Sequence, residues 1–252
     1  MILDKSFWLP PPDLSISQWA DEFRRIPPEA SAEPGIWNTS RAEYQREIMN
    51  AISDSLTERV IMMTAAQVGK SEIILNTIGY YIDKEPAPIL LINPTLEMGE
   101  SFSKDRLAPM IRDTPCLSAK IADPRTRDSG NTLLHKKFAG GHITIAGANS
   151  PASLASRPIR ILLCDEVDRY PLSAGTEGDP LTLAMKRTQN FWNRRIVWVS
   201  TPTLRSTSRI SQAFENSSQE EWTVPCKRCG KYNSFEWARI IYKERTEPVM
   251  IC

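Results

Sequence analysis

Short apolar segments separated by helical stretches constrain the fold of this 252-residue chain more than any other sequence feature. The clearest is residues 88–93, Pro-Ile-Leu-Leu-Ile-Asn, an uninterrupted apolar run of the kind that is buried on both faces of a parallel sheet. Similar segments predict strands at 60–64, 159–164 and 195–200. Residues 132–137 and 142–146 flank Gly140 and Gly141, which predicts a β-hairpin.

Helical patterns lie between these strands. In residues 41–58 the apolar side chains recur every four positions, at Tyr44, Ile48, Ile52 and Leu56, which predicts one amphipathic helix. Further helices are expected from the turn at 69–71 to about residue 82, and at 95–112, 179–191 and 206–216. The alternation predicts an α/β fold with a mostly parallel sheet and helices on both faces, whose ligands bind at the carboxyl ends of the strands.

Composition places few limits on function. The 31 Lys and Arg residues nearly balance the 30 Asp and Glu residues, so net charge neither supports nor excludes a nucleic-acid partner. No segment is long and apolar enough to span a membrane, and the amino terminus lacks a signal-peptide pattern, so we expect a cytosolic protein. Proline clusters predict that residues 1–35 form an arm, before a main domain at 36–220 and a small segment at 221–252.

The segment from Thr64 to Ser71, Thr-Ala-Ala-Gln-Val-Gly-Lys-Ser, lies where a strand turns into a helix. It matches the phosphate-binding pattern GxxxxGK[ST] except that Thr64 replaces the first glycine. Gly69 lets the backbone curl around phosphates, together with Ala66, Gln67 and Val68; Lys70 reaches the β- and γ-phosphates, and the Ser71 hydroxyl can bind Mg²⁺. The alternative is an ordinary loop in which Ser71 caps a helix.

Two adjacent carboxylates follow the buried strand at 159–164. In a Walker B arrangement Asp165 holds Mg²⁺, directly or through water, and Glu166 orients and deprotonates the attacking water. The alternative is two exposed acids in a turn before Tyr170 and Pro171. The position of this pair, after a phosphate loop and intervening β-α units, favours a nucleotide-hydrolysing site.

Two weaker motifs complete the candidate site. Ser200 and Thr201 end the next strand, where their hydroxyls can sense an occupied γ-phosphate position. Tyr44 and Gln45 lie near the start of the helix that precedes the phosphate loop, where an aromatic ring can stack on adenine and a carboxamide can pair with its edge. Tyr44 is equally consistent with a residue of the apolar helix face.

The order of these motifs resembles the motor domain of phage terminase large subunits, and most closely the lambda-like GpA group. Further resemblance lies in residues 79–80, 93–95, 103–112 and 147–157, and it extends from about Trp37 to the carboxyl terminus. The resemblance implies a P-loop NTPase of the ASCE, RecA-like type that uses ATP and Mg²⁺.

The resemblance also implies partners and a setting. Members of this group pump double-stranded DNA through the portal of a procapsid, work with a small terminase subunit, and act as homo-oligomers in the host cell cytoplasm. A full-length relative also carries a metal-dependent nuclease domain, and we expect no complete nuclease site in these residues.

One departure from the family pattern concerns an arginine. Many terminases carry an arginine next to the glutamine of the phosphate loop, where this sequence has Ala66. A charge-stabilising arginine must then come from elsewhere. We expect Arg157, acting in its own chain or on a neighbouring subunit, and Arg160 as a weaker alternative; Arg157 is equally consistent with a surface residue or a DNA-phosphate contact.

The cysteines suggest a partial zinc site. Cys226 and Cys229 form a CxxCG knuckle, which turns two thiolates toward one ion. Cys252 follows at a spacing that would begin a second CxxC of a zinc ribbon, a pattern the GpA group shares. We expect this carboxyl-terminal segment to resemble part of a zinc ribbon and possible Zn²⁺ binding through these three cysteines.

Two other classes of protein fit part of the sequence. A DExx-box helicase or remodeller is compatible with Asp165-Glu166-Val-Asp168, and strand separation rather than duplex translocation would distinguish it. A non-enzymatic DNA-binding or scaffold protein built on the zinc ribbon is the other alternative, and absence of nucleotide binding would favour it.

Overall fold

The structure, a computed structural model, describes residues 13–31, 33–122, 130–155, 157–204, 206–241 and 249–250. The chain divides into two compact units, Met1–Ala213 and Phe214–Cys252. The division therefore falls inside helix α9 (Arg209–Glu215), a few residues before the boundary expected from sequence.

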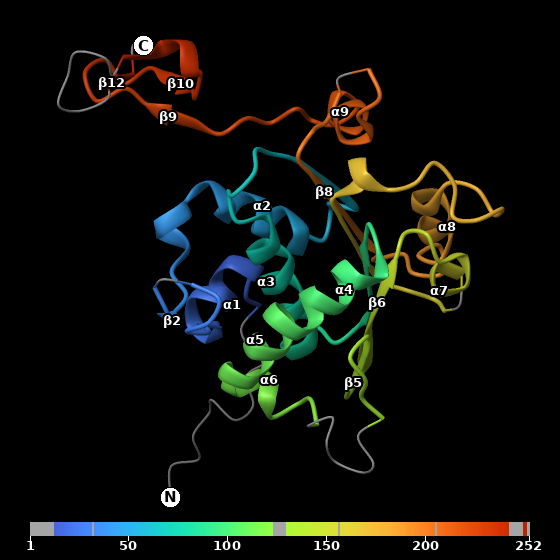
Figure 1. Ribbon diagram of the computed structural model, residues 1–252. Helices are drawn as coiled ribbons and strands as arrows, with labels where there is room; N and C mark the ends of the chain where they lie inside the picture. The colour runs from blue at the N-terminus through green and yellow to red at the C-terminus, as the bar shows by residue number, and fades with distance from the viewer. Residues whose placement is uncertain are drawn as a thin grey trace, which may run out of the picture. The chain divides into compact units, whose positions relative to one another are not determined.

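A six-stranded sheet forms the centre of the first unit, in the order β3-β8-β7-β4-β6-β5 (Figure 1). The strands are β3 (Arg59–Met63), β4 (Pro88–Asn93), β5 (His135–Phe138), β6 (Gly141–Gly147), β7 (Ile161–Asp165) and β8 (Arg195–Ser200). Neighbouring strands run parallel except β5, which pairs antiparallel with β6 at the edge. The predicted α/β fold with a mostly parallel sheet is thereby confirmed.

Alternate residues of the central strands point to opposite faces of the sheet. In β4, Ile89 and Leu91 belong to one buried cluster, whereas Leu90 and Ile92 belong to another. Because side chains alternate along a strand, a strand that is apolar at every position needs a cover on both faces.

Helices cover both faces of the sheet. The first cluster is covered by α1 (Ile16–Phe23), α2 (Tyr44–Ser53), α3 (Lys70–Asp83), α4 (Leu96–Phe102), α5 (Ala108–Asp113) and α6 (Pro115–Ser118). The second is covered by α7 (Pro151–Ala155), α8 (Pro180–Lys186) and α9. Short pieces complete the unit: β1 (Arg25–Ile26), β2 (Gly35–Ile36), and the 3-10 helices η2 (Thr39–Ala42) and η4 (Val167–Arg169).

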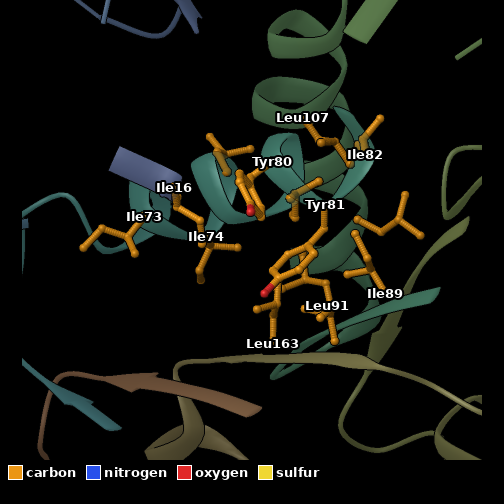
Figure 2. Packing of buried hydrophobic residues seen from close by; sticks show 14 of the residues in the cluster. Ile16, Ile73, Ile74, Tyr80, Tyr81, Ile82, Ile89, Leu91, Leu107 and Leu163 are labelled. Atoms are coloured by element: carbon orange, nitrogen blue, oxygen red, sulfur yellow. The ribbon is translucent and has the colours of Figure 1, made fainter. Parts of the chain in front are cut away.

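Helix α3 fixes the position of the phosphate loop because most of its side chains are buried. Figure 2 shows Tyr81 of α3 lying over Leu91 and Leu163 of the sheet. Tyr81 is fully buried, and its hydroxyl donates a hydrogen bond to the carbonyl oxygen of Ile52 in α2. Because α3 packs against both the sheet and α2, the position of its amino end beside the sheet is fixed.

The expectation of an amino-terminal arm is wrong for residues 15–26. Helix α1 begins with a capping box between Ser15 and Gln18 and is part of the core. Trp19 is fully buried, packs against Gly79 of α3, where a Cβ atom would overlap its ring, and donates a hydrogen bond to Asp83 Oδ2 at 3.0 Å. Trp19 therefore packs on the chain's own domain.

Several helices differ from their predicted extents, including α8, which ends at Lys186 and not at residue 191. Helix α2 ends at Ser53, and Leu56 is 92% exposed, because the chain turns at Asp54 toward β3. The single helix expected at 95–112 is interrupted by a π-helical turn, Ser103–Leu107, between α4 and α5. Such turns shift the direction of the side chains that they carry.

The second unit is small. Its strands β9 (Thr223–Pro225) and β10 (Tyr232–Ser234) pair antiparallel, and so do β11 (Ile240–Ile241) and β12 (Val249–Met250). A 3-10 turn, η5 (Trp237–Arg239), precedes β11.

Candidate nucleotide site

The loop between β3 and α3 has the conformation that phosphate binding requires. Gly69 directly precedes α3 with φ of +81°, in the left-handed region that glycine tolerates. A Cβ atom at this position would overlap the carboxamide of Gln45. No side chain caps the amino end of α3, so its first backbone amides and its helix dipole are available to an anion.

Tyr44 and Gln45 both contact this loop. The Tyr44 hydroxyl and Gln45 Nε2 each donate a hydrogen bond to the carbonyl oxygen of Val68, at 3.1 Å in both cases. Gln45 is buried, and Tyr44 is half-buried. The two side chains therefore lie beside the phosphate loop, where they support its backbone; their contact with adenine stays a prediction.

Lys70 joins the three principal motifs. It is the first residue of α3 and is only 9% exposed. Its ammonium lies 3.1 Å from Glu166 Oε1 and donates a hydrogen bond to Thr201 Oγ1. Glu166 and Thr201, which follow Lys70 by about a hundred positions or more, thus contact the same ammonium group.

Asp165 is the last residue of β7 and is 8% exposed. Burial, and next the negative charge of Glu166, raise the pKa of Asp165 to about 6, against the attraction of Lys70 and Arg106. A buried carboxylate beside a second carboxylate suits a divalent cation, which would supply compensating positive charge.

Glu166 has an unusual backbone conformation. Its φ of +53° and ψ of +52° lie in the left-handed region, which is uncommon for a residue with a side chain. Its Oε2 atom is buried and accepts no hydrogen bond within the described part of the chain. Strain together with an unsatisfied carboxylate oxygen is typical of a functional position.

The carboxyl end of β8 lies between the phosphate loop and the acidic pair. Because β8 pairs with both β3 and β7, its last residue meets the loops that follow them. The amide of Thr64 donates to the Ser200 carbonyl oxygen at 3.2 Å, and the amide of Asp168 donates to Ser200 Oγ at 3.3 Å. Ser200 and Thr201 therefore contact both the phosphate-loop segment and the segment that follows the acidic pair.

Several acceptor oxygens at this edge of the sheet are buried without a hydrogen-bond partner among the described residues. They are Gln45 Oε1, Thr64 Oγ1, Asn93 Oδ1 and Glu166 Oε2. Buried acceptors left unpaired are costly, so donors or a cation complete them in function. The uncapped helix, the lysine and these oxygens together fit a phosphate group with its Mg²⁺.

Comparison with known proteins identifies the family. Residues 31–252 match the sequence profile of the ATPase domain of the phage terminase large subunit gpA. The chain belongs to this family.

The curated terminase relatives agree. The chain is 28% identical to the large subunit of the terminase of Enterobacteria phage P21 over 223 residues, which are 88% of the chain and 34% of the relative. It is 28% identical to the terminase large subunit of Escherichia phage lambda over 229 residues, 90% of the chain and 35% of the relative. The chain thus spans about a third of these relatives' length.

A solved structure supports the terminase fold. The large terminase of the HK97 bacteriophage superposes on 81% of the chain and 41% of its own, with a TM-score of 0.64 and 13% sequence identity. This likeness establishes a shared fold. Family membership, together with the contacts of Lys70 with Glu166 and Thr201, identifies the chain as the ATPase domain of a terminase large subunit.

Arg157 does not lie with the other site residues of this terminase domain. It precedes β7, whereas Asp165 ends it, and five strand residues span roughly 16 Å at ~3.3 Å each. Arg157 therefore lies at the amino end of the strands, and its action within its own chain disagrees with the structure. Arg160 is buried and binds Glu85, so it is structural.

Two residues near the site had no assigned role from sequence. Arg106, in the π-helical turn, acts on the pKa of Asp165 through its charge. Asp168 follows the acidic pair and binds the loop after β8. No local pattern predicts either contact, because each depends on how distant segments pack.

The cysteine knuckle lies in the second unit. Cys226 and Cys229 are in the turn between β9 and β10, where the Cys226 amide donates to the Lys231 carbonyl oxygen at 2.9 Å. Cys252 lies outside the described residues. Within those residues no group of three or more His, Cys, Asp or Glu side chains could hold a metal ion. The zinc site stays a prediction.

Among the helices of the described residues, none is both long and apolar enough to cross a membrane.

Proposed function

We propose that this terminase domain hydrolyses ATP to drive double-stranded DNA into a procapsid. The observation that carries the proposal is the contact of Lys70 with both Glu166 and Thr201, since it joins the phosphate loop, the acidic pair and the strand beside them. Membership of the terminase family favours duplex translocation over helicase activity or a scaffold role.

Each site residue has a role in this reaction. The amides around Gly69 and the ammonium of Lys70 bind the phosphates. Ser71 and Asp165 would hold Mg²⁺, which would neutralise negative charge on the phosphates. Glu166 accepts the proton of the attacking water, and Thr201 detects whether the γ-phosphate position is filled.

Lys70 cannot serve the phosphates and Glu166 equally. A phosphate group that binds Lys70 competes with Glu166 Oε1, which lies 3.1 Å from the ammonium. Releasing this carboxylate provides a free base for water. Binding of the substrate therefore prepares the residue that hydrolyses it.

Arg157 would act on the site of a neighbouring subunit. Its exposed side chain lines a pocket of about 200 Å³ with Lys186 and Arg187, and the lining includes no acidic residue. An unpaired basic surface suits a phosphate-bearing partner. A neighbour would supply the charge that stabilises phosphoryl transfer, which makes the active form a homo-oligomer.

The wider setting follows from the family. We propose the portal of a procapsid and a small terminase subunit as protein partners, and the cytoplasm of the infected host as the site of action. The contacts with DNA are expected to be mostly with phosphates, because a translocase must release each position after every step. Nuclease activity of the full-length protein and Zn²⁺ binding by Cys226, Cys229 and Cys252 belong to the same proposal.

The motor assignment is tested by ATP turnover with and without double-stranded DNA at several salt concentrations. We expect DNA to raise turnover by the wild type and added salt to remove that increase. Lys70→Ala should be inactive in both conditions. Turnover that single-stranded DNA stimulates, with strand separation and no response to duplex, would instead support a helicase.

Subunit mixing tests the role of Arg157. Lys70→Ala subunits bind no nucleotide but carry an intact Arg157, and Arg157→Ala subunits have the opposite defect. If the arginine acts between subunits, the mixture hydrolyses more ATP than either variant alone. Arg112→Ala serves as the control, since Arg112 pairs with Glu29 and Asp113 instead. A mixture no more active than its components would remove Arg157 from this role.

A further inference from the structure

Asp168 binds a segment that lies 35 to 42 residues later in the sequence. Its Oδ2 atom accepts hydrogen bonds from the Thr203 amide at 2.9 Å and the Thr203 hydroxyl at 3.1 Å. Its Oδ1 atom accepts one from the Ile210 amide at 2.8 Å, and the Ser208 side chain also bonds to it. One carboxylate therefore holds the loop after β8 and the start of α9.

The backbone of Asp168 is attached to the nucleotide site. Asp168 lies in η4, whose preceding residue is Glu166, and the Arg169 amide donates to the Glu166 carbonyl oxygen at 2.9 Å. The Asp168 amide donates to Ser200 Oγ, next to Thr201, which binds Lys70. A movement of Glu166 or of the end of β8 thus displaces Asp168.

The carboxylate remains charged in this environment. Burial by itself would raise the pKa of Asp168, but hydrogen bonds from Ser208, Ile210 and Thr203 outweigh burial, and the pKa is lowered. Hydrogen bonds to an ionised acceptor are stronger than neutral ones. The ionised carboxylate therefore binds the loop after β8 and the start of α9 through charge-assisted hydrogen bonds.

A second set of contacts, made by Arg209, also holds α9. The Arg209 guanidinium donates to the Pro171 carbonyl oxygen at 2.9 Å and lies 3.3 Å from Asp179. This contact joins α9 to the loop before α8 and makes no hydrogen bond to Thr203 or Ser200. It provides a matched comparison for Asp168.

We propose that Asp168 is a positioning residue that transmits the nucleotide state of the site to α9, the helix that continues into the second unit. The inference rests on the proposed ATPase function. When a bound nucleotide draws Lys70 from Glu166, the residue that precedes η4 is released from that ion pair, and Asp168 transmits the change to Thr203 and Ile210.

The test measures amide hydrogen exchange at residues 203–215 of the full chain with no nucleotide, with ADP, and with a non-hydrolysable ATP analogue. In the wild type we expect exchange at Thr203 and Ile210 to depend on the nucleotide. In Asp168→Asn the nucleotide affinity should stay within about twofold, while this dependence disappears and DNA no longer stimulates turnover. Asp168→Glu should restore part of the response.

Asp179→Asn is the control, because it weakens the other attachment of α9 and should keep the nucleotide response. If Asp168→Asn does not fold, Thr203→Val removes one hydrogen bond to the carboxylate and should reduce the response. If amide exchange still depended on nucleotide in Asp168→Asn and Thr203→Val, the inference would be overturned and the proposed function would not. The same would follow if Asp179→Asn lost that dependence to the same extent. Absence of nucleotide binding by the wild type would overturn the proposed function as well.

Discussion

The ammonium of Lys70 lies 3.1 Å from Glu166 Oε1, so the cation proposed to bind phosphate and the proposed catalytic base form an ion pair. Both side chains are largely buried, at 9% and 18% exposure. The pair keeps a strained acidic residue neutralised, and any phosphate that binds Lys70 must compete with it.

Glu166→Gln should therefore bind ATP more tightly than the wild type. Loss of an ion pair worth about 1 kcal/mol corresponds to a dissociation constant about fivefold lower. Titration with a fluorescent ATP analogue measures the difference. Glu177→Gln, which removes an exposed acid from the loop before α8, should leave affinity unchanged. Equal or weaker binding by Glu166→Gln would mean that the ion pair does not compete with phosphate.

Gly69→Ala should reduce nucleotide affinity at least tenfold. The substitution strains a backbone with φ of +81° and displaces Gln45 from the loop. Gly175→Ala is the matched control, because Gly175 has φ of +56° but only Pro151 nearby, at 3.5 Å. Both variants should lose about 1 kcal/mol of stability from strain. If the two variants bound nucleotide with similar affinity, the loop conformation at Gly69 would not be required for phosphate binding.

Trp19→Ala should destabilise the domain by about 3–5 kcal/mol, because it removes a fully buried side chain that packs against Gly79. Trp192→Ala should change stability by no more than about 0.5 kcal/mol, since Trp192 is 88% exposed. Urea unfolding measures both free energies. A small effect at Trp19 would restore the interpretation of residues 15–26 as a dispensable arm.

Asp83 should make stability depend on pH in the acid range. Burial alone would raise its pKa, but hydrogen bonds from Lys120 and Trp19 outweigh it and the pKa is lowered. An acid with a lowered native pKa stabilises the fold above its unfolded value, and this contribution is lost as pH falls through the native pKa. The wild type should exceed Asp83→Asn by up to about 1 kcal/mol at pH 7. The difference should shrink below about pH 4; a constant difference would contradict this account.

Much of the fold follows from sequence because its strands are buried on both faces. The strand at 88–93 was predicted with its observed bounds, since no polar residue interrupts it. The expectation that ligands bind at the carboxyl ends of the strands directs attention to the segments that carry Lys70, Glu166 and Thr201. In the structure Lys70 contacts both of the other two residues.

Other features depend on contacts between distant segments. Four-residue periodicity extended the helix at 44–53 to Leu56, but the chain leaves the helix at Asp54 and Leu56 reaches solvent. Proline clusters favour an arm at residues 1–35, but α1 is part of the core, and its burial depends on the absence of a side chain at Gly79. The DExx-like run that contains Asp168 gives no sign of its contacts, because its partners lie in another loop and another helix.

ATP hydrolysis by the wild type, Lys70→Ala and Glu166→Gln, with nucleotide binding measured on the same samples, tests the central claim most directly. The account predicts that the wild type binds and hydrolyses ATP, at concentrations that allow subunits to associate. Lys70→Ala should bind none, and Glu166→Gln should bind but hydrolyse at least about a hundredfold more slowly. A wild-type chain that binds no nucleotide, or a Glu166→Gln variant with unchanged turnover, would contradict it.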